Sequence, residues 1–211
     1  MRTRTDPFFV AAGLYLTVGL LAVVGNLAVG LDVLEPLPRL RWVTIHLVTI
    51  GGATQALFGA LPRLLGGDAA DRRAPPTRWG RWLALNAGYL LVLLGMATGE
   101  SVVAVAGATL VLGALALLLA AVWRLAGDGA GAFARHYRVA PGFFAVGILA
   151  AFGMLLGVHG PGGYFGSLEA HVHANVWGFL GLVAAATLSR FALALAGGDR
   201  RYPRLRRVAF R

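Results

Sequence analysis

Six long stretches of apolar residues divide the sequence, and polar residues gather in the segments between them. The stretches cover about 8–30, 42–62, 82–99, 101–123, 139–158 and 171–196. Each is long enough to cross the hydrocarbon core of a bilayer, about 30 Å thick, as a helix that rises about 1.5 Å per residue. Their apolar character is continuous and does not alternate, which favours helices over a β-barrel. The pattern predicts an all-α, polytopic membrane protein with six transmembrane helices in a single integral membrane domain, residues 1–211.

The composition agrees with a membrane protein. Hydrophobic residues make up 58% of the chain and charged residues 13%, which is too little polar surface to cover a water-soluble globule. The formal net charge of +10 is also typical of nucleic-acid-binding proteins, but here the arginines flank the apolar stretches. We therefore expect membrane lipids and no nucleic acid as partners. Attraction to anionic lipid headgroups accounts for the basic tail, residues 197–211.

The arginines also predict how the chain is oriented. With the six spans as drawn, Arg39 and Arg41 lie on one side of the membrane, and the other arginines lie on the opposite side. Basic residues favour the cytoplasmic side of a membrane. We therefore expect a multi-pass protein of the plasma membrane with both termini in the cytoplasm. The first apolar stretch is too long for the core of a typical signal peptide, so we expect it to be an anchored helix.

Cysteine is absent from the sequence. Its absence excludes disulfides, iron–sulfur clusters, thiolate metal sites and covalent haem attachment through a C-x-x-C-H motif. A metal centre in this chain must use histidine, methionine or carboxylate ligands.

Four of the five histidines are expected in the outer half of the membrane. His46 lies about one turn inside the second span, His159 ends the fifth span, and His171 and His173 stand at the start of the sixth. Residues two apart on a helix are separated by roughly 200°, so His171 and His173 face different sites. A histidine in a membrane helix is costly and indicates function. The alternative for His46 is a role in packing only. The alternative for His171 and His173 is that they form hydrogen bonds to loop carbonyls. The fifth histidine, His136, is expected to lie at the cytoplasmic interface.

The second and sixth spans share a short pattern. Ile45-His46-Leu-Val-Thr-Ile-Gly51 aligns with Val172-His173-Ala-Asn-Val-Trp-Gly178, and the same register places Arg63 opposite Arg190. Both spans run from outside to inside, so the two histidines enter the membrane at matching depths. The match favours an internal repeat of two three-helix units, and the alternative is a chance match in an apolar sequence rich in glycine.

Histidines on facing apolar helices, without thiolates, are typical of haem sites. Two imidazoles ligate the iron axially, while the porphyrin fills the gap between the helices. The two haem propionates need cations at the edge of the bilayer, and Arg39 and Arg41 are suitably placed to bind them. The alternative for these arginines is an ion pair with Asp32 or Glu35.

His46 on an early helix, followed by His171-Val-His173 on a late one, resembles the haem-ligand pattern of the catalytic subunit of haem-copper oxygen reductases and nitric oxide reductases. The resemblance implies that His46 and His173 ligate a low-spin haem, and that His171 is the proximal ligand of a second haem. The chain has about half the helices of that subunit and lacks the histidine motif for copper or non-haem iron. It therefore resembles a reduced six-helix relative, in which His159 is a distal ligand opposite His171 or caps the fifth helix.

We therefore expect a haem-binding membrane protein, with b-type haem and one or two haems per chain, that transfers electrons or binds a diatomic gas. As an oxidoreductase subunit it would take electrons from a soluble donor on the outer side, within a homodimer or a larger respiratory assembly. We do not expect a complete terminal oxidase. Two other hypotheses stay open: an outer-face copper site that adds Met96 and Met154 to the four histidines, and an assembly subunit without a cofactor.

Overall fold

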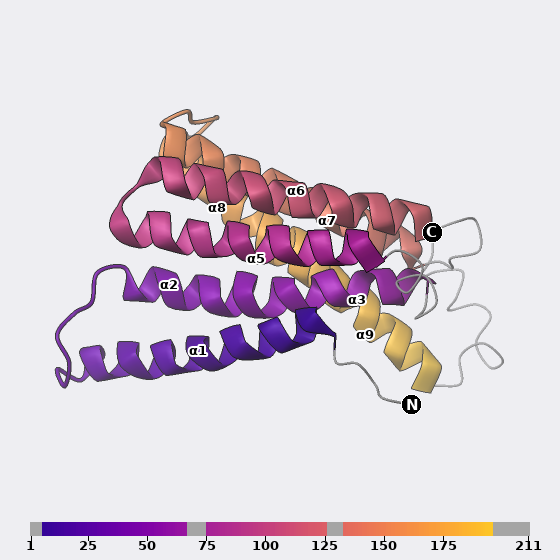
Figure 1. Cartoon of the computed structure of the whole chain (residues 1–211), viewed down its shortest axis with the longest axis horizontal. Coiled ribbons are helices and arrows are strands. Elements are labelled where there is room, and N and C mark those ends of the chain that lie inside the picture. The colour runs from indigo at the N-terminus through magenta and orange to yellow at the C-terminus, as the bar shows by residue number, and fades with distance from the viewer. Residues whose placement is uncertain (1–5, 67–74, 126–132, 196–211) are drawn as a thin grey trace. The chain divides into compact units, whose positions relative to one another are not determined.

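The computed structural model describes residues 6–66, 75–125 and 133–195 (Figure 1). Helices hold 89% of these residues, and there is no strand among them. The described residues include six helices long and apolar enough to cross a membrane: Pro7–Gly30, Leu40–Leu65, Thr77–Thr98, Ser101–Leu125, Ala134–Leu156 and Gly163–Leu195. The prediction of an all-α, polytopic membrane fold with six spans is confirmed. The basic tail, residues 197–211, lies outside the described residues.

Four of the spans are regular α-helices: α1 (Pro7–Gly30), α5 (Pro75–Thr98), α6 (Ser101–Leu125) and α7 (Ala134–Leu156). The second span is composite and consists of α2 (Leu40–His46), the π-helix η1 (Leu47–Thr54) and α3 (Gln55–Gly66). The sixth has the same construction, with α8 (Gly163–His173), the π-helix η2 (Ala174–Gly181) and α9 (Leu182–Leu195).

The helix bounds differ most from the apolar stretches at the sixth span. That span begins at Gly163 and contains 33 residues, whereas its apolar stretch begins at about 171. Hydropathy marks the part of a helix that meets hydrocarbon, but the backbone hydrogen bonds of a helix continue beyond it. At about 1.5 Å per residue this helix is longer than a hydrocarbon core of about 30 Å. The apolar stretch therefore marked this helix from about residue 171 to its end and missed roughly its first two turns.

The chain divides into two compact units, which are described one at a time. Unit 1 is residues 1–118 and contains α1, the second span, α5 and most of α6. Unit 2 is residues 119–211 and contains the end of α6, α7 and the sixth span. The single membrane domain expected from the sequence stays a prediction.

Small residues let the helices of unit 1 approach closely. A Cβ atom added to Gly88 in α5 would lie 2.6 Å from the carbonyl oxygen of Gly107 in α6, and one added to Gly107 would lie 2.5 Å from that of Gly88. The two backbones therefore touch at this point, as is common between membrane helices, where dispersion contacts replace the hydrophobic effect. Larger side chains at these two positions would separate α5 from α6.

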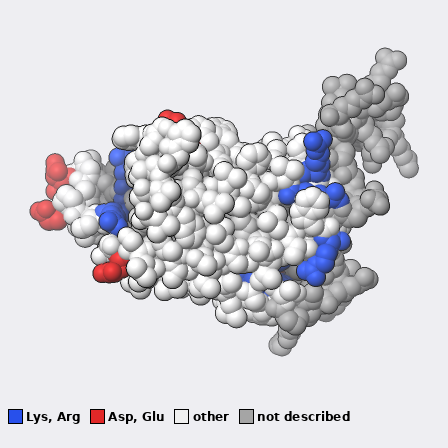
Figure 2. All heavy atoms as spheres, turned by 90° about the horizontal axis from the view of Figure 1, so that it is seen from above, with Lys and Arg blue, Asp and Glu red and all other residues white. Residues whose placement is uncertain are grey.

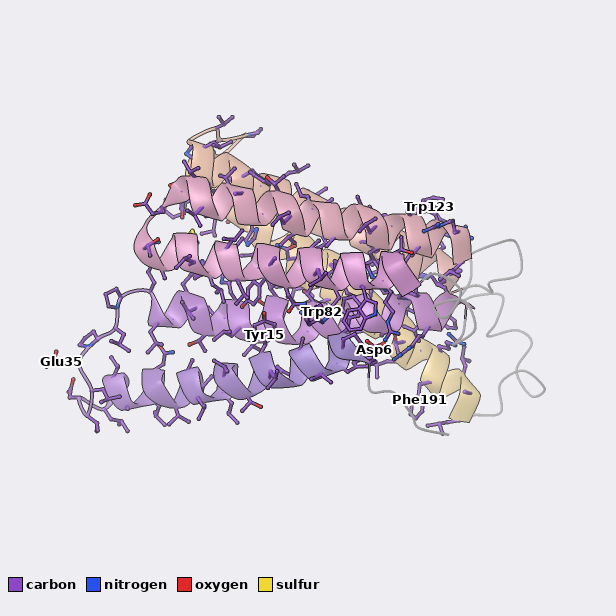
Figure 3. The ribbon with its side chains drawn as sticks, viewed as in Figure 1. Asp6, Tyr15, Glu35, Trp82, Trp123 and Phe191 are labelled. Atoms are coloured by element: carbon purple, nitrogen blue, oxygen red, sulfur yellow. The ribbon has the colours of Figure 1, made fainter. Side chains whose placement is uncertain are left out.

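A buried carboxylate joins three helices at one end of unit 1 (Figure 3). Asp6 is the N-cap of α1, and its Oδ1 accepts a hydrogen bond from the Phe8 amide at 2.9 Å. Its Oδ2 lies 2.5 Å from Arg63 Nη2 and 2.9 Å from Arg78 Nη2, while the side chain is only 2% exposed. The start of α1, the end of the second span and the start of α5 are therefore held on the same side.

In unit 2, α7 packs against α8 and η2 through aromatic and small side chains. The rings of Phe144 and Phe179 stack with centroids 4.9 Å apart. The hydroxyls of Tyr137 in α7 and Thr187 in α9 lie 3.1 Å apart and form a hydrogen bond. These contacts join the fifth span to the sixth along most of its length.

The outward surfaces of the helices are apolar. Leu14, Leu20 and Val102 are each more than 60% exposed, at 65%, 64% and 80%. Figure 2 shows charged side chains near the ends of the helices and uncharged surface along them. Because a water-soluble protein rarely exposes so much contiguous apolar surface, this distribution agrees with helices that face lipid.

Replacing Asp6 with alanine removes both the cap acceptor and the partner of two arginines. We expect it to lower the free energy of unfolding by about 2–4 kcal/mol, because it removes the helix cap and leaves two half-buried guanidinium groups without their carboxylate. Asp6→Asn should cost less, since asparagine still caps a helix. The measurement is denaturant unfolding in detergent micelles, with Thr17→Ala, which loses only an exposed bond to Gly13 O, as the control. Equal stability of Asp6→Ala and the control would contradict the role given to Asp6.

Candidate functional site

His46 is the last residue of α2 and directly precedes η1. Its Nδ1 lies 2.9 Å from the carbonyl oxygen of Trp42, one turn earlier. The imidazole also stacks on the indole of Trp42, with ring centroids 3.8 Å apart and planes inclined by 24°. Trp42 therefore holds the half-buried imidazole of His46 in one orientation through both its backbone and its ring.

His171 and His173 end α8 and meet different surroundings. His171 reaches the neighbouring helix, where its Nδ1 lies 2.8 Å from the carbonyl oxygen of Gly147 in α7. The side-chain nitrogen of Asn175 lies 3.2 Å from the same Nδ1. His173 is exposed, and its Nδ1 lies 2.9 Å from the carbonyl oxygen of Glu169 on its own helix.

These contacts favour one tautomer of the imidazoles. A carbonyl oxygen can only accept a hydrogen bond, so Nδ1 of His46 and of His173 carries the proton and donates it. The same bond from His171 to Gly147 O requires the Asn175 amide to turn its oxygen toward Nδ1, because a protonated Nδ1 cannot accept from an amide nitrogen. In this tautomer the lone pair is on Nε2. A neutral imidazole whose Nδ1–H is held by a carbonyl is the usual form of a metal-ligating histidine. The chemistry of these donors therefore fits an iron ligand.

His159 lies outside the helices, in the loop between α7 and α8. It is exposed, and its ring meets that of Tyr164 edge-on, with centroids 5.8 Å apart. It does not cap α7, because Gly157 occupies that position in the left-handed conformation (φ 69°) and donates to Gly153 O. His159 as a distal haem ligand stays a prediction.

Arg39 and Arg41 begin the second span. Arg39 is the N-cap of α2, and its Nη1 donates to the carbonyl oxygen of Met96 near the end of α5. A cation suits this position, since the last carbonyls of a helix carry partial negative charge. Arg41 is exposed on α2. Within the described loop, neither arginine forms an ion pair with Asp32 or Glu35, and their contact with haem propionates stays a prediction.

The other residues considered for a metal site lie on α5 and α7. Met96 is a half-buried residue of α5 in unit 1, whereas Met154 is a half-buried residue of α7 in unit 2. His136 lies near the start of α7 and is also half-buried. In the part of the chain that the structure describes, no group of three or more His, Cys, Asp or Glu residues is arranged to hold a metal ion.

The two composite spans repeat one local design. His46 and His173 are each followed immediately by a π-helical segment of 8 residues. The fifth residue of each segment is a glycine that packs on an aromatic side chain of the neighbouring span, which is α1 for η1 and α7 for η2. A Cβ atom on Gly51 would lie 2.7 Å from Cβ of Tyr15 in α1, and one on Gly178 would lie 2.5 Å from Cγ of Phe143 in α7.

The helices α1 and α7, which pack against these two segments, also carry glycines at matching positions. Gly19 follows Tyr15 by four residues, and Gly147 follows Phe143 by four. Gly19 accommodates Val48, two residues after His46, whereas Gly147 accommodates Asn175, two residues after His173. The matched pieces are therefore helical hairpins: hairpin 1 is α1 with the second span, and hairpin 2 is α7 with the sixth. The repeat defined by these contacts is a two-helix hairpin, and the three-helix unit expected from the sequence stays a prediction.

A cluster of polar side chains in unit 1 was not anticipated. Asn86 Oδ1 in α5 accepts hydrogen bonds from Tyr15 Oη at 3.1 Å and from Gln55 Nε2 at 2.6 Å. Asn86 Nδ2 donates to Trp82 O at 2.8 Å, and the ring of Tyr89 meets that of Tyr15 edge-on at 5.1 Å. The signal in the sequence was the presence of amide and phenol side chains inside apolar spans, where polar groups are costly.

Gly51→Ala tests the close approach of η1 to α1. Its new methyl group must displace Tyr15, so we expect a loss of about 1–3 kcal/mol of stability from overpacking. Gly178→Ala should act in the same way through Phe143. The control is Gly13→Ala in α1, where an added Cβ meets no atom within 4 Å. Unfolding in detergent measures the three effects, and a Gly51→Ala variant as stable as Gly13→Ala would be evidence against this packing.

Comparisons with known proteins give no relative to guide the assignment, because no protein-family model, curated protein or solved structure matches this chain.

Proposed function

We propose that this chain is a haem-binding membrane protein in which His46, His171 and His173 are iron ligands. The observation that carries the proposal is the common state of the three imidazoles. Each donates its Nδ1 proton to a backbone carbonyl and carries its lone pair on Nε2. The resemblance described above supplies the roles: His46 and His173 for a low-spin haem, and His171 for a second haem, with His159 as its distal ligand.

The π-helical segments support the choice of His46 and His173. π-Helical turns are rare and occur frequently at functional sites. Two segments of equal length, each directly after a histidine and each with glycine at its fifth position, indicate that the local geometry serves the histidines. Their Nδ1 atoms bind the carbonyls of Trp42 and Glu169, each four residues earlier, so the two rings are held in the same manner.

The chain's own residues would bind and orient the cofactor. Trp42 holds His46 through ring stacking and a carbonyl, and Gly147 O holds His171, so each imidazole is kept in one orientation. His173 is exposed on a helix long enough to span the membrane, where a polar imidazole is costly. Bound b-type haem, one or two per chain, would supply reversible one-electron transfer or a site for a diatomic gas.

The proposed setting is the plasma membrane, with both termini in the cytoplasm and the histidines toward the outer face. The charges of unit 1 support this orientation. Arg63 and Arg78 contact Asp6 at one end, and the buried Arg81 stacks over Phe8 at the same end, 5.2 Å from the ring centroid. Basic residues concentrate on the cytoplasmic side of membrane proteins. A soluble electron donor would then approach from the outer side.

The first test is a reduced minus oxidised visible spectrum of the protein purified in detergent, with haem and copper quantified per chain. We expect the sharp reduced band of a bis-histidine haem and its loss in His46→Ala and in His173→Ala, because each substitution removes an axial ligand. His136→Ala is the control and should keep the band. A folded protein that neither contains haem nor binds added haem would refute the proposal. Bound copper would then favour the copper-handling hypothesis, and no metal an assembly subunit.

Cysteine labelling tests the orientation, since the natural chain has no cysteine. Val33 follows α1 and is 71% exposed, and Trp123 lies near the end of α6 and is 61% exposed. In intact cells we expect a membrane-impermeant maleimide to label Val33→Cys, because it lies on the outer side. Trp123→Cys should be labelled only after lysis. The reverse pattern would place both termini outside.

A further inference from the structure

The polar cluster of unit 1 combines two buried side chains, those of Gln55 and Tyr89, with two half-buried ones, those of Tyr15 and Asn86. Gln55 and Tyr89 are each only 1% exposed, and they come from different helices, α3 and α5. Asn86 Oδ1 joins the cluster by accepting from both Gln55 Nε2 and Tyr15 Oη. Figure 3 labels Tyr15 on α1 and Trp82, whose carbonyl accepts from Asn86. Hydrogen bonds among Tyr15, Asn86 and Gln55 thus link α1, α5 and α3, and Tyr89 joins them through its ring contact with Tyr15.

Two buried polar atoms of this cluster lack a hydrogen-bond partner among the described residues. They are Gln55 Oε1 and Tyr89 Oη. A buried polar group without a partner costs on the order of 1–3 kcal/mol. Most buried polar atoms in folded proteins have a partner, either a protein group or an ordered water molecule. Two such atoms in one cluster therefore indicate a ligand that the chain itself does not supply.

Hairpin 2 shows that the packing of a hairpin does not require these polar groups. Gln55 is the first residue after η1, and the first residue after η2 is Leu182. Tyr15 packs on Gly51, and the matching ring on Gly178 is that of Phe143. Hairpin 2 therefore has apolar side chains at both positions. The amide of Gln55 and the phenol of Tyr15 are therefore not needed for the packing of hairpin 1.

We infer that Gln55, Asn86, Tyr15 and Tyr89 form a buried water-binding site in unit 1. The amide oxygen of Gln55 needs a donor, and the hydroxyl of Tyr89 needs a donor or an acceptor. Amide and phenol groups offer no charge to balance an ion, whose burial would be very costly. Water is neutral, both donates and accepts, and is stable in a protein interior when it has two to four polar partners. The site does not depend on the proposed haem.

The chain allows a direct test, because Gln55 is its sole glutamine. Glutamine labelled with ¹⁵N in the side-chain amide gives one signal from the folded protein in lipid bilayers. Solid-state NMR then measures transfer of magnetisation from water to this amide. We expect transfer to the Gln55 amide in the natural protein and its loss in Tyr89→Phe, which removes one partner of the water. Absence of transfer in the natural, folded protein would overturn the inference.

Thermal unfolding gives a second readout. Tyr89→Phe removes a hydroxyl that, when bonded to water, stabilises the fold, so the melting temperature should fall. If that hydroxyl instead has no partner, its removal relieves a cost and the melting temperature should rise, which would also overturn the inference. Tyr164→Phe is the matched control, since Tyr164 is 50% exposed and its hydroxyl should matter little. Both variants keep the aromatic ring, so packing is preserved.

Discussion

Hydrocarbon offers no hydrogen-bond partners, and this constraint governs every polar group in the six spans. Most of them are satisfied within their own helix. Side chains bond to the carbonyl oxygen four residues earlier, as in the pairs Thr17 with Gly13, Thr44 with Leu40, Thr49 with Ile45, Asn26 with Ala22, and Asn86 with Trp82. His46 and His173 use the same bond to hold Nδ1. In the proposed scheme, the bond that satisfies the imidazole in lipid also holds it in place for a metal.

The positions of His46 and His173 also depend on how closely their helices approach the neighbouring helix. Gly51 and Gly178 allow π-helical segments to lie directly against Tyr15 and Phe143. Because these segments begin one residue after His46 and His173, the packing of each hairpin sets the position of its histidine. The same local structure arises twice from sequences that share few side chains. Glycines at matching positions, and not overall similarity, carry the repeat.

The two hairpins differ in the polar side chains that they carry at matching positions. Hairpin 2 brings His171 to Gly147 O and places the amide of Asn175 beside it. Hairpin 1 has Thr44 at the position that matches His171, where it accepts a hydrogen bond from Asn26 at 2.7 Å. Hairpin 1 in turn carries Tyr15 and Gln55, which join α5 through Asn86. In the proposed scheme, both hairpins present a haem ligand, hairpin 2 adds a second one, and hairpin 1 holds buried water.

Hydropathy alone was sufficient to predict the fold class and the six spans, because length and apolarity decide whether a helix can cross a bilayer. Helix bounds were less predictable, as at Gly163, since backbone hydrogen bonding continues outside hydrocarbon. Only the tertiary structure showed that Asp6 pairs with Arg63 and Arg78, that Gly147 O holds His171, and that Gln55 meets Asn86. These contacts join residues 24 to 72 positions apart, and no periodic pattern encodes them. They follow from which helices pack together, and that depends on where small residues let two backbones approach.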